Sequence, residues 1–100
     1  MAKRIILTPL AEANYENIIN YLIANWGNKV TLNFIKRFDQ VSQILEDFPQ
    51  IYPFINKKKR IQKCVVTKHN TIYFTVKPDG VYILTTFDTR QDPGKLSVIL

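Results

Sequence analysis

Residues 61–87 read IQKCVVTKHNTIYFTVKPDGVYILTTF, a stretch rich in β-branched and aromatic residues. Two turn signals interrupt it, KHN at 68–70 and PDG at 78–80, where proline fixes φ and glycine supplies a positive φ. The remaining segments have the length and composition of strands. Because strands joined by tight turns pair antiparallel, we predict a three-stranded antiparallel meander over residues 61–67, 71–77 and 81–87.

Upstream of the meander, the hydrophobic spacing predicts two helices, over residues 9–25 and 28–47. Thr8 is placed to cap the first helix, and Pro9 suits its first position because proline lacks the amide hydrogen that would be unpaired there. Gly27 interrupts the pattern, and Pro49 ends it. Since the connection is so short, the two helices are expected to form an antiparallel hairpin.

Each predicted helix carries one apolar stripe, spaced by three or four residues. The first stripe is Tyr15, Ile18, Ile19, Leu22 and Trp26, and the second is Val30, Phe34, Phe38, Val41, Leu45 and Phe48. Both stripes have to be covered, so we expect the hairpin to pack on one face of the sheet. Trp26 is expected to be buried at the helix junction, near Phe34 and Phe38.

These elements predict an α+β fold in one domain spanning residues 1–100, since this length supports a single hydrophobic core. The segment 3–7 is a short predicted strand, which fits either an edge of the sheet or a place between its strands. The segment 49–60 holds two prolines and a basic run, so an exposed loop is expected there.

The positive charge is confined to the second half of the chain. Residues 1–50 carry five basic and five acidic residues, whereas residues 51–100 carry nine and three, so the net charge of +6 lies in the second half. Four basic residues are consecutive, from Lys57 to Arg60. This asymmetry favours an acidic or polyanionic partner, although a lysine-rich loop can also be simply solvated.

Several functional classes are excluded by the composition. No apolar run approaches the roughly 20 residues of a membrane-spanning helix. His69 is the only histidine and Cys64 the only cysteine, which rules out the usual metal sites, and the three glycines are isolated, so no phosphate loop is present. We therefore expect no metal and no cofactor. Cys64 lies in a predicted strand and is read as a buried small hydrophobe, in a cytoplasmic protein.

The candidate functional side chains lie in and around the meander. Strand alternation places Gln62 and Cys64 on one face and Lys63 on the other. Asp88 and Asp92 flank Arg90, and local ion pairing is the preferred interpretation of these three residues.

Parts of this sequence resemble the RelE/ParE superfamily of bacterial toxins from type II toxin-antitoxin pairs. In the second half the resemblance is carried by CVVTKH at 64–69, IYFTV at 72–76 and ILTTFDTRQDPGKL at 83–96. In the first half it is carried by TPLA at 8–11, Tyr21-Leu22, Trp26-Gly27, Phe34 and Phe38. The resemblance implies a strand, two antiparallel helices and a three-stranded meander, in a toxin neutralised by an antitoxin encoded beside it.

Two branches of the superfamily imply different targets: some members are ribosome-dependent mRNA endonucleases, and others poison DNA gyrase. The nucleases need a base, an acid and charge stabilisation for attack by the 2′-hydroxyl. Arg90 matches a basic position that contacts the phosphate in the nucleases, but Gln62 stands where a lysine or arginine is usual and Thr71 replaces an arginine. The tail 97–100 supplies neither tyrosine nor histidine.

The resemblance therefore predicts a toxin with ParE-like action on DNA gyrase rather than an enzyme. One alternative is a RelE-like endonuclease that acts on the ribosome and mRNA, with a variant site of Lys63, His69, Tyr73 and Arg90. A second alternative is a degenerate member that binds its antitoxin with weak toxicity. The predicted target-binding residues are Lys57, Lys58, Lys59, Arg60, Lys63 and Arg90, and the predicted partner is a cognate antitoxin in a hetero-oligomer.

Overall fold

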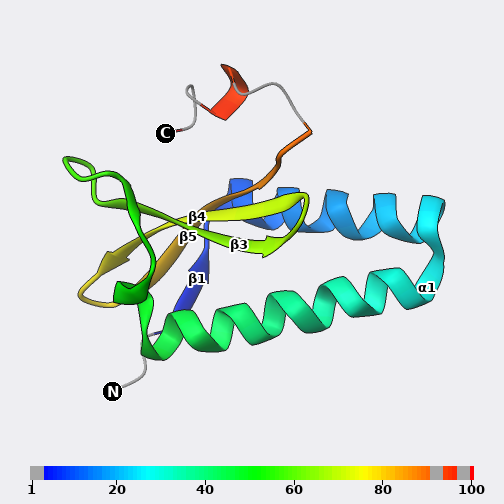
Figure 1. Cartoon of the computed structure of the whole chain (residues 1–100), viewed down its shortest axis with the longest axis horizontal. Helices are drawn as coiled ribbons and strands as arrows, with labels where there is room; N and C mark the ends of the chain where they lie inside the picture. Colours follow the sequence, from blue (N-terminus) through cyan, green and yellow to red (C-terminus); the bar gives the residue numbers. More distant parts are fainter. Residues whose placement is uncertain (1–3, 91–93, 97–99) are drawn as a thin grey trace.

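The computed structural model describes residues 4–90, 94–96 and 100. Its elements follow the order β-α-β, in which a long helical segment separates a first strand from the rest of the sheet (Figure 1). The elements are β1 (Ile5–Leu7), α1 (Pro9–Asp47), the short 3₁₀ helix η1 (Pro49–Ile51), β2 (Phe54–Asn56), β3 (Ile61–Thr67), β4 (Asn70–Lys77) and β5 (Gly80–Asp88).

The strands form one mixed sheet in the order β1-β5-β4-β3-β2. The β3-β4-β5 meander is antiparallel, as predicted from its turns. The N-terminal strand β1 lies at an edge, parallel to β5, with Ile5 opposite Val81. At the other edge, β2 pairs with β3, so the segment predicted as a plain loop contains a strand and η1. The prolines at 49 and 53 both precede β2, Pro49 as the first residue of η1 and Pro53 directly before the strand.

The segment α1 is a helical hairpin whose two arms, 9–26 and 28–47, run antiparallel (Figure 1). The Thr8 hydroxyl accepts a hydrogen bond from the Ala11 amide at 3.2 Å, and Pro9 occupies the first turn, as predicted. Gly27 breaks the helix with φ 84° and ψ −179°, a left-handed φ that glycine adopts without steric cost. The hairpin is therefore confirmed, and Gly27 is its hinge.

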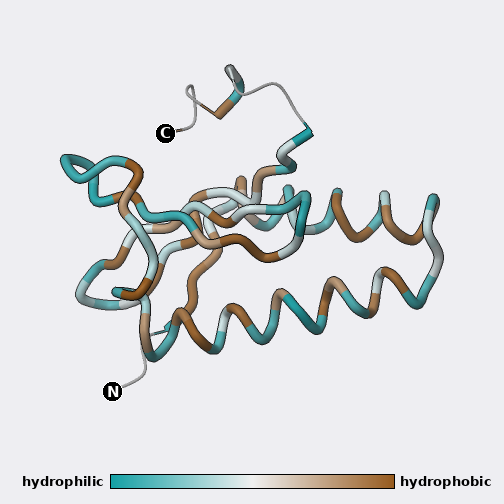
Figure 2. The backbone as a smooth tube through the Cα atoms, viewed as in Figure 1, coloured by the Kyte–Doolittle hydropathy of each residue, from teal (hydrophilic) through white to brown (hydrophobic). Residues whose placement is uncertain are grey.

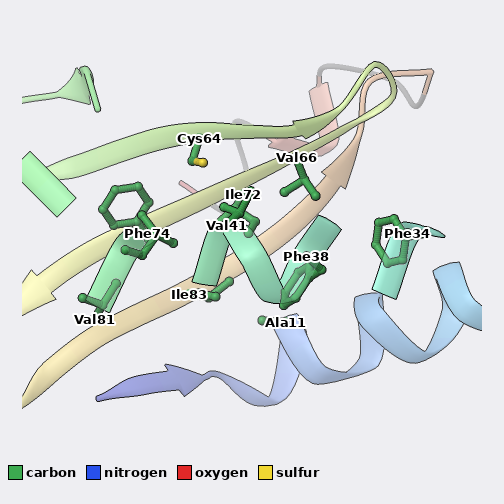
Figure 3. Packing of buried hydrophobic residues seen from close by; sticks show 11 residues of the cluster. Ala11, Phe34, Phe38, Val41, Cys64, Val66, Ile72, Phe74, Val81 and Ile83 are labelled. Carbon is green, nitrogen blue, oxygen red and sulfur yellow. The ribbon is translucent and has the colours of Figure 1, made fainter. Parts of the chain in front are cut away.

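The core lies between the hairpin and the sheet (Figure 3). Ala11, Phe34, Phe38, Val41 and Leu45 of α1 pack against Cys64, Val66, Ile72, Phe74, Val81 and Ile83 of the strands. Figure 2 shows hydrophobic and hydrophilic residues alternating along both arms, as the two stripes require. Cys64 is buried, as expected for a small hydrophobe in this strand.

Trp26 contradicts the prediction of burial, because 61% of its surface is exposed. The hairpin extends beyond the strands (Figure 1), so its tip has no sheet to pack against. A side chain added at Gly27 would likewise meet no atom within 4 Å. The apolar stripe thus continues past the end of the core, and Trp26 is a surface residue.

Gly80 also differs from its prediction, because its φ is not positive. Its role is instead to admit the neighbouring strand: a Cβ at Gly80 would lie 2.8 Å from the carbonyl oxygen of Arg4. The adjacent Val81 amide donates a hydrogen bond to that same oxygen at 2.7 Å. A side chain at this position would push β1 away from β5.

Candidate functional site

Arg90 follows the end of β5 and is held by the last residue of that strand, Asp88. Its Nε and Nη2 donate hydrogen bonds to the two carboxylate oxygens of Asp88 at 3.0 and 2.8 Å, and its backbone amide adds a third at 2.9 Å. These bonds lower the pKa of Asp88 and raise that of Arg90. The guanidinium also lies over the ring of Tyr21, 5.7 Å from its centroid.

The predicted local ion pairing is confirmed for Asp88 and Arg90. Asp92, the other carboxylate of that prediction, lies outside the described residues, as do the rest of the 91–93 run and residues 97–99 of the tail. The pair is exposed enough for its guanidinium to remain accessible, since 47% of the Arg90 side chain is open to solvent.

The basic run forms the exposed turn between β2 and β3, visible as the green loop in Figure 1. The Arg60 amide donates to the Lys57 carbonyl at 3.3 Å and closes the turn, while Asn56 Oδ1 accepts from the Lys59 amide at 3.0 Å. The Lys59 ammonium donates to the carbonyl of Leu100 at 2.7 Å. The strands β2 and β3 thus hold all four cationic residues, Lys57, Lys58, Lys59 and Arg60, at one corner of the sheet.

Lys63 and Tyr73 are directly opposed on β3 and β4. Lys63 is exposed, whereas its neighbours Gln62 and Cys64 are buried on the helix side, so Lys63 and Tyr73 occupy the other face of the sheet. Burial raises the pKa of the Tyr73 phenol. One amine and one phenol of the candidate set are therefore neighbours.

His69 and Arg90 lie at a different place. Both line a cavity of about 390 Å³ on the helix side, together with Trp26 and Phe34 of α1. His69 is in the tight β3–β4 turn, where its carbonyl accepts a hydrogen bond from the Thr89 amide at 2.8 Å. The four candidate catalytic side chains are thus divided into two pairs, one on each side of the sheet.

Gln62 has a structural role in this protein. The resemblance to the RelE/ParE superfamily aligns it with a position where the nucleases carry a lysine or arginine. Only 3% of the Gln62 surface is exposed, and its Nε2 donates to the carbonyl oxygens of Pro49 and Tyr52 at 2.8 and 3.0 Å. Both carbonyls belong to the connection between α1 and β2. The amide therefore fastens this connection to the sheet, and a buried charge would be costly in the same place.

Sequence reasoning did not identify the groove that runs along the helix side of the sheet. Its apolar part is the 390 Å³ cavity, and a second, more polar cavity of about 270 Å³ adjoins it, since Leu22, Asn70 and Arg90 line both. Trp26 was the available signal, because a tryptophan beside a helix-breaking glycine at the end of a stripe can lie beyond the core. We call the apolar part the hairpin groove.

The described part of the chain holds neither a metal-binding cluster nor a membrane-spanning helix. Among residues 4–90, 94–96 and 100, no group of three or more His, Cys, Asp or Glu side chains is arranged to hold a metal ion. Within the same residues, no helix has the length and hydrophobicity needed to cross a membrane.

Comparison of the sequence with known families supplies the identification. Residues 5–93 match the family described as ParE toxin of type II toxin-antitoxin system, parDE. The chain belongs to the ParE toxin family. It is therefore the toxin component of a type II toxin-antitoxin system, and the resemblance noted in its sequence is confirmed. No curated protein sequence matches it significantly.

Solved structures with the same fold agree with membership of the ParE toxin family. The chromosomal ParDE system of P. aeruginosa contains a chain with TM-score 0.72 and 13% identity, over 87% of this chain and 96% of that one. The YoeB-YefM complex of Staphylococcus aureus contains a chain that matches with TM-score 0.58 and 13% identity, over 87% of this chain and 97% of that one. The conserved hypothetical protein HP0894 of Helicobacter pylori matches with TM-score 0.53 and 16% identity, over 91% of this chain and 98% of that one. At these identities the likeness shows the fold alone, and that fold is the α+β arrangement predicted.

Proposed function

We propose that this ParE family toxin arrests growth by binding DNA gyrase and does not cleave RNA. The observation that carries the proposal is the division of the candidate nuclease residues. Lys63 and Tyr73 lie on one side of the sheet, and His69 and Arg90 line a cavity on the other. A base, an acid and a phosphate-stabilising cation have to meet at one reacting phosphate, within hydrogen-bond reach, for RNA cleavage.

The surface that would contact the target is the basic corner made by the 57–60 turn, with Lys63 beside it on the outer face. These cations are exposed, and none of Lys57, Lys58, Arg60 and Lys63 has an acidic partner among the described residues. Such a concentration of positive charge accelerates encounter with an acidic surface and makes binding dependent on salt. Arg90 would contribute separately, from the helix side. We expect the protein to act in the cytoplasm.

We also propose that a cognate antitoxin neutralises the toxin in a hetero-oligomeric complex. The structural relatives in P. aeruginosa and S. aureus are described as a ParDE system and as a YoeB-YefM complex. The hairpin groove and the exposed edge strand β2 are surfaces on which a partly disordered acidic segment could fold. Co-expression with the neighbouring gene is expected to give a complex that survives purification at physiological salt. Co-purification no better than that of an unrelated pair would refute this partner.

The alternative target, mRNA on the ribosome, is favoured by one observation, the cross-strand pair of Lys63 and Tyr73. An exposed amine beside a phenol could supply two of the groups that RNA cleavage needs. Tyr73→Phe separates the two targets, because it removes the proton-transferring hydroxyl and keeps the ring.

The experiment combines induction of the toxin in cells with two assays of purified components. Wild-type protein is expected to arrest growth and to inhibit supercoiling by gyrase, and it should leave ribosome-bound mRNA intact. Tyr73→Phe should be as toxic as wild type. If the wild-type protein cleaves mRNA and Tyr73→Phe does not, the protein is a nuclease of the RelE type. If cells grow normally after induction of the wild-type protein, it is a degenerate member with weak toxicity.

A further inference from the structure

The polar cavity beside the hairpin groove contains two buried side chains with unpaired polar atoms. Asn70 on β4 and Thr86 on β5 are only 8% and 3% exposed. Within the described residues, Asn70 Oδ1 and Thr86 Oγ1 have no hydrogen-bond partner. Both residues line the same cavity of about 270 Å³, which the first arm of α1 closes with Asn14, Asn17 and Ile18.

The sheet register explains why these two atoms face one cavity. Asn70 is opposite Asp88, and Ile72 is opposite Thr86, so Asn70 and Thr86 are diagonal neighbours two positions apart on adjacent strands. Buried polar atoms in native proteins almost always have partners, because leaving one unpaired costs stability. Two such atoms lining one cavity are placed to form hydrogen bonds with a group that enters it.

The hydrogen bonds already present define what that group must offer. Asn70 Nδ2 donates to Thr67 Oγ1 at 2.9 Å, so the acceptor oxygen Oδ1 is the atom of this side chain that has no partner. The Thr86 hydroxyl can both donate and accept. A group that pairs both atoms therefore needs an N–H or O–H donor for Asn70, with either an acceptor or a second donor for Thr86.

The charges of the cavity favour an uncharged group. Its two ionised residues, Asp88 and Arg90, neutralise each other through a two-point ion pair at the rim. An ion entering the cavity would lose its hydration without an unpaired counter-charge to replace it. A primary carboxamide is neutral and carries an N–H donor and a carbonyl acceptor on one planar group.

We propose that this cavity binds the side-chain carboxamide of a glutamine or asparagine on a protein segment seated in the hairpin groove. The groove adjoins the cavity through Leu22, Asn70 and Arg90, and it presents the exposed apolar side chain of Trp26. A nucleobase is the less suitable occupant, because its recognition depends on stacking. Tyr21, the aromatic residue lining the cavity, already has the Arg90 guanidinium over its ring.

That the carboxamide belongs to a protein segment rests on the proposed antitoxin, but the preference of the cavity for a carboxamide can be tested without any partner. The probes are N-acetyl-glutamine methylamide and its glutamate and methionine counterparts, titrated into the whole labelled protein and followed by NMR at Asn70 and Thr86. All three probes have the same backbone amides, so differences between them isolate the side-chain group. Cytidine is the fourth probe.

The glutamine probe is expected to give saturable shifts and to bind about tenfold more tightly than the glutamate and methionine probes, the factor that corresponds to one or two hydrogen bonds. Thr86→Val should abolish this preference, and Thr86→Ser, which keeps the hydroxyl, should retain it. Thr75→Val is the control, because Thr75 lies on β4 but lines none of this cavity.

Stability gives a second readout. Thr85 is the adjacent buried threonine, and its hydroxyl donates to Asn14 Oδ1 at 2.6 Å. Thr85→Val should therefore lower the melting temperature, whereas Thr86→Val should leave it unchanged or raise it, because its hydroxyl is unpaired in the free protein.

Three results would overturn the proposal. Equal binding of the glutamine, glutamate and methionine probes would remove the carboxamide preference. Tighter binding of cytidine would assign the cavity to a nucleobase. A melting temperature for Thr86→Val as low as that of Thr85→Val would make the hydroxyl structural. None of these results depends on whether the antitoxin co-purifies, so they are distinguishable from failure of the proposed function.

Discussion

Asp88, the last residue of β5, and Arg90, two residues further on, form a two-point ion pair, and the guanidinium also lies over the ring of Tyr21. The pair fixes the position of the cation without burying it. An arginine held in this way presents a planar fork in a defined orientation, which lysine cannot reproduce.

Arg90→Ala is expected to keep the fold and relieve growth inhibition, and Arg90→Lys should restore only part of the toxicity. Lys77→Ala is the control for the loss of one positive charge. Lys77 is the last residue of β4, whereas the Asp88–Arg90 pair lies beside Asn70 at the start of that strand. Growth after induction is measured alongside circular dichroism of each variant. A folded Arg90→Ala protein that arrests growth like wild type would exclude Arg90 from the target-binding surface.

Trp26→Ala is expected to leave the melting temperature almost unchanged, since exposed substitutions usually alter stability by no more than about 0.5 kcal/mol. Its exposed ring should instead contribute to partner binding, because tryptophans are frequent hot spots of interfaces. Calorimetric titration of the variant with the co-purified antitoxin should show at least a tenfold loss of affinity, by about 1.4 kcal/mol or more. Leu32→Ala is the matched control, as Leu32 is equally exposed but does not line the hairpin groove. A large fall in melting temperature would mean that Trp26 packs in the core.

Gln62→Leu is expected to destabilise the protein by about 1–3 kcal/mol, because it leaves the carbonyls of Pro49 and Tyr52 without their donor. Urea denaturation measures this loss. Gln43→Leu should be nearly neutral, since the Gln43 side chain makes an exposed hydrogen bond to Asp39. Equal effects of the two substitutions would contradict a fastening role for Gln62.

Gly80→Ala is expected to weaken the pairing of β1 with β5, because its Cβ would lie 2.8 Å from the Arg4 carbonyl oxygen. Overpacking of this kind costs about 1–3 kcal/mol. Hydrogen exchange should show faster loss of protection at the Val81 amide, which donates to Arg4. Pro78→Ala, in the same turn, is the control. Unchanged protection of Val81 in Gly80→Ala would show that β1 adjusts without cost.

The alkaline stability of the protein should depend on Tyr52. Burial, and then the neighbouring thiol of Cys64, raise the pKa of Tyr52 from its ordinary value of 10.0 to about 12. The folded protein thus keeps a proton that the unfolded chain releases above pH 10, so stability should fall as pH rises from 10 to about 12. Tyr52→Phe should reduce this slope while preserving the edge-on contact with Phe74. Urea midpoints measured across this range test the effect, and identical slopes would refute it.

The elements with local signals were predictable from the sequence. The hairpin follows from Thr8, Pro9 and Gly27, whose effects on the backbone are intrinsic, and the meander follows from its two turns. The opposite orientations of Gln62 and Lys63 follow from strand alternation and are confirmed.

The remaining features depend on contacts between distant parts of the chain. The spacing of residues could not predict the position of β1, because its pairing with β5 joins residues 76 positions apart in the sequence, such as Ile5 and Val81. Trp26 is exposed because the helical hairpin extends beyond the sheet. The cavity at Asn70 and Thr86 depends on the register between β4 and β5 and on the position of α1 over them. A periodic pattern identifies the apolar face of a helix, but it does not show how much of that face the sheet covers.

The edge position of β1 has a consequence for the order in which the toxin is made. The first strand and both helical arms leave the ribosome before β5, the strand that β1 pairs with and on which α1 rests. Contacts between distant segments can form only when both segments are available. The nascent chain therefore cannot close its core until β5 has been made, so the folded surface of the toxin forms only after the first strand and both helical arms have left the ribosome.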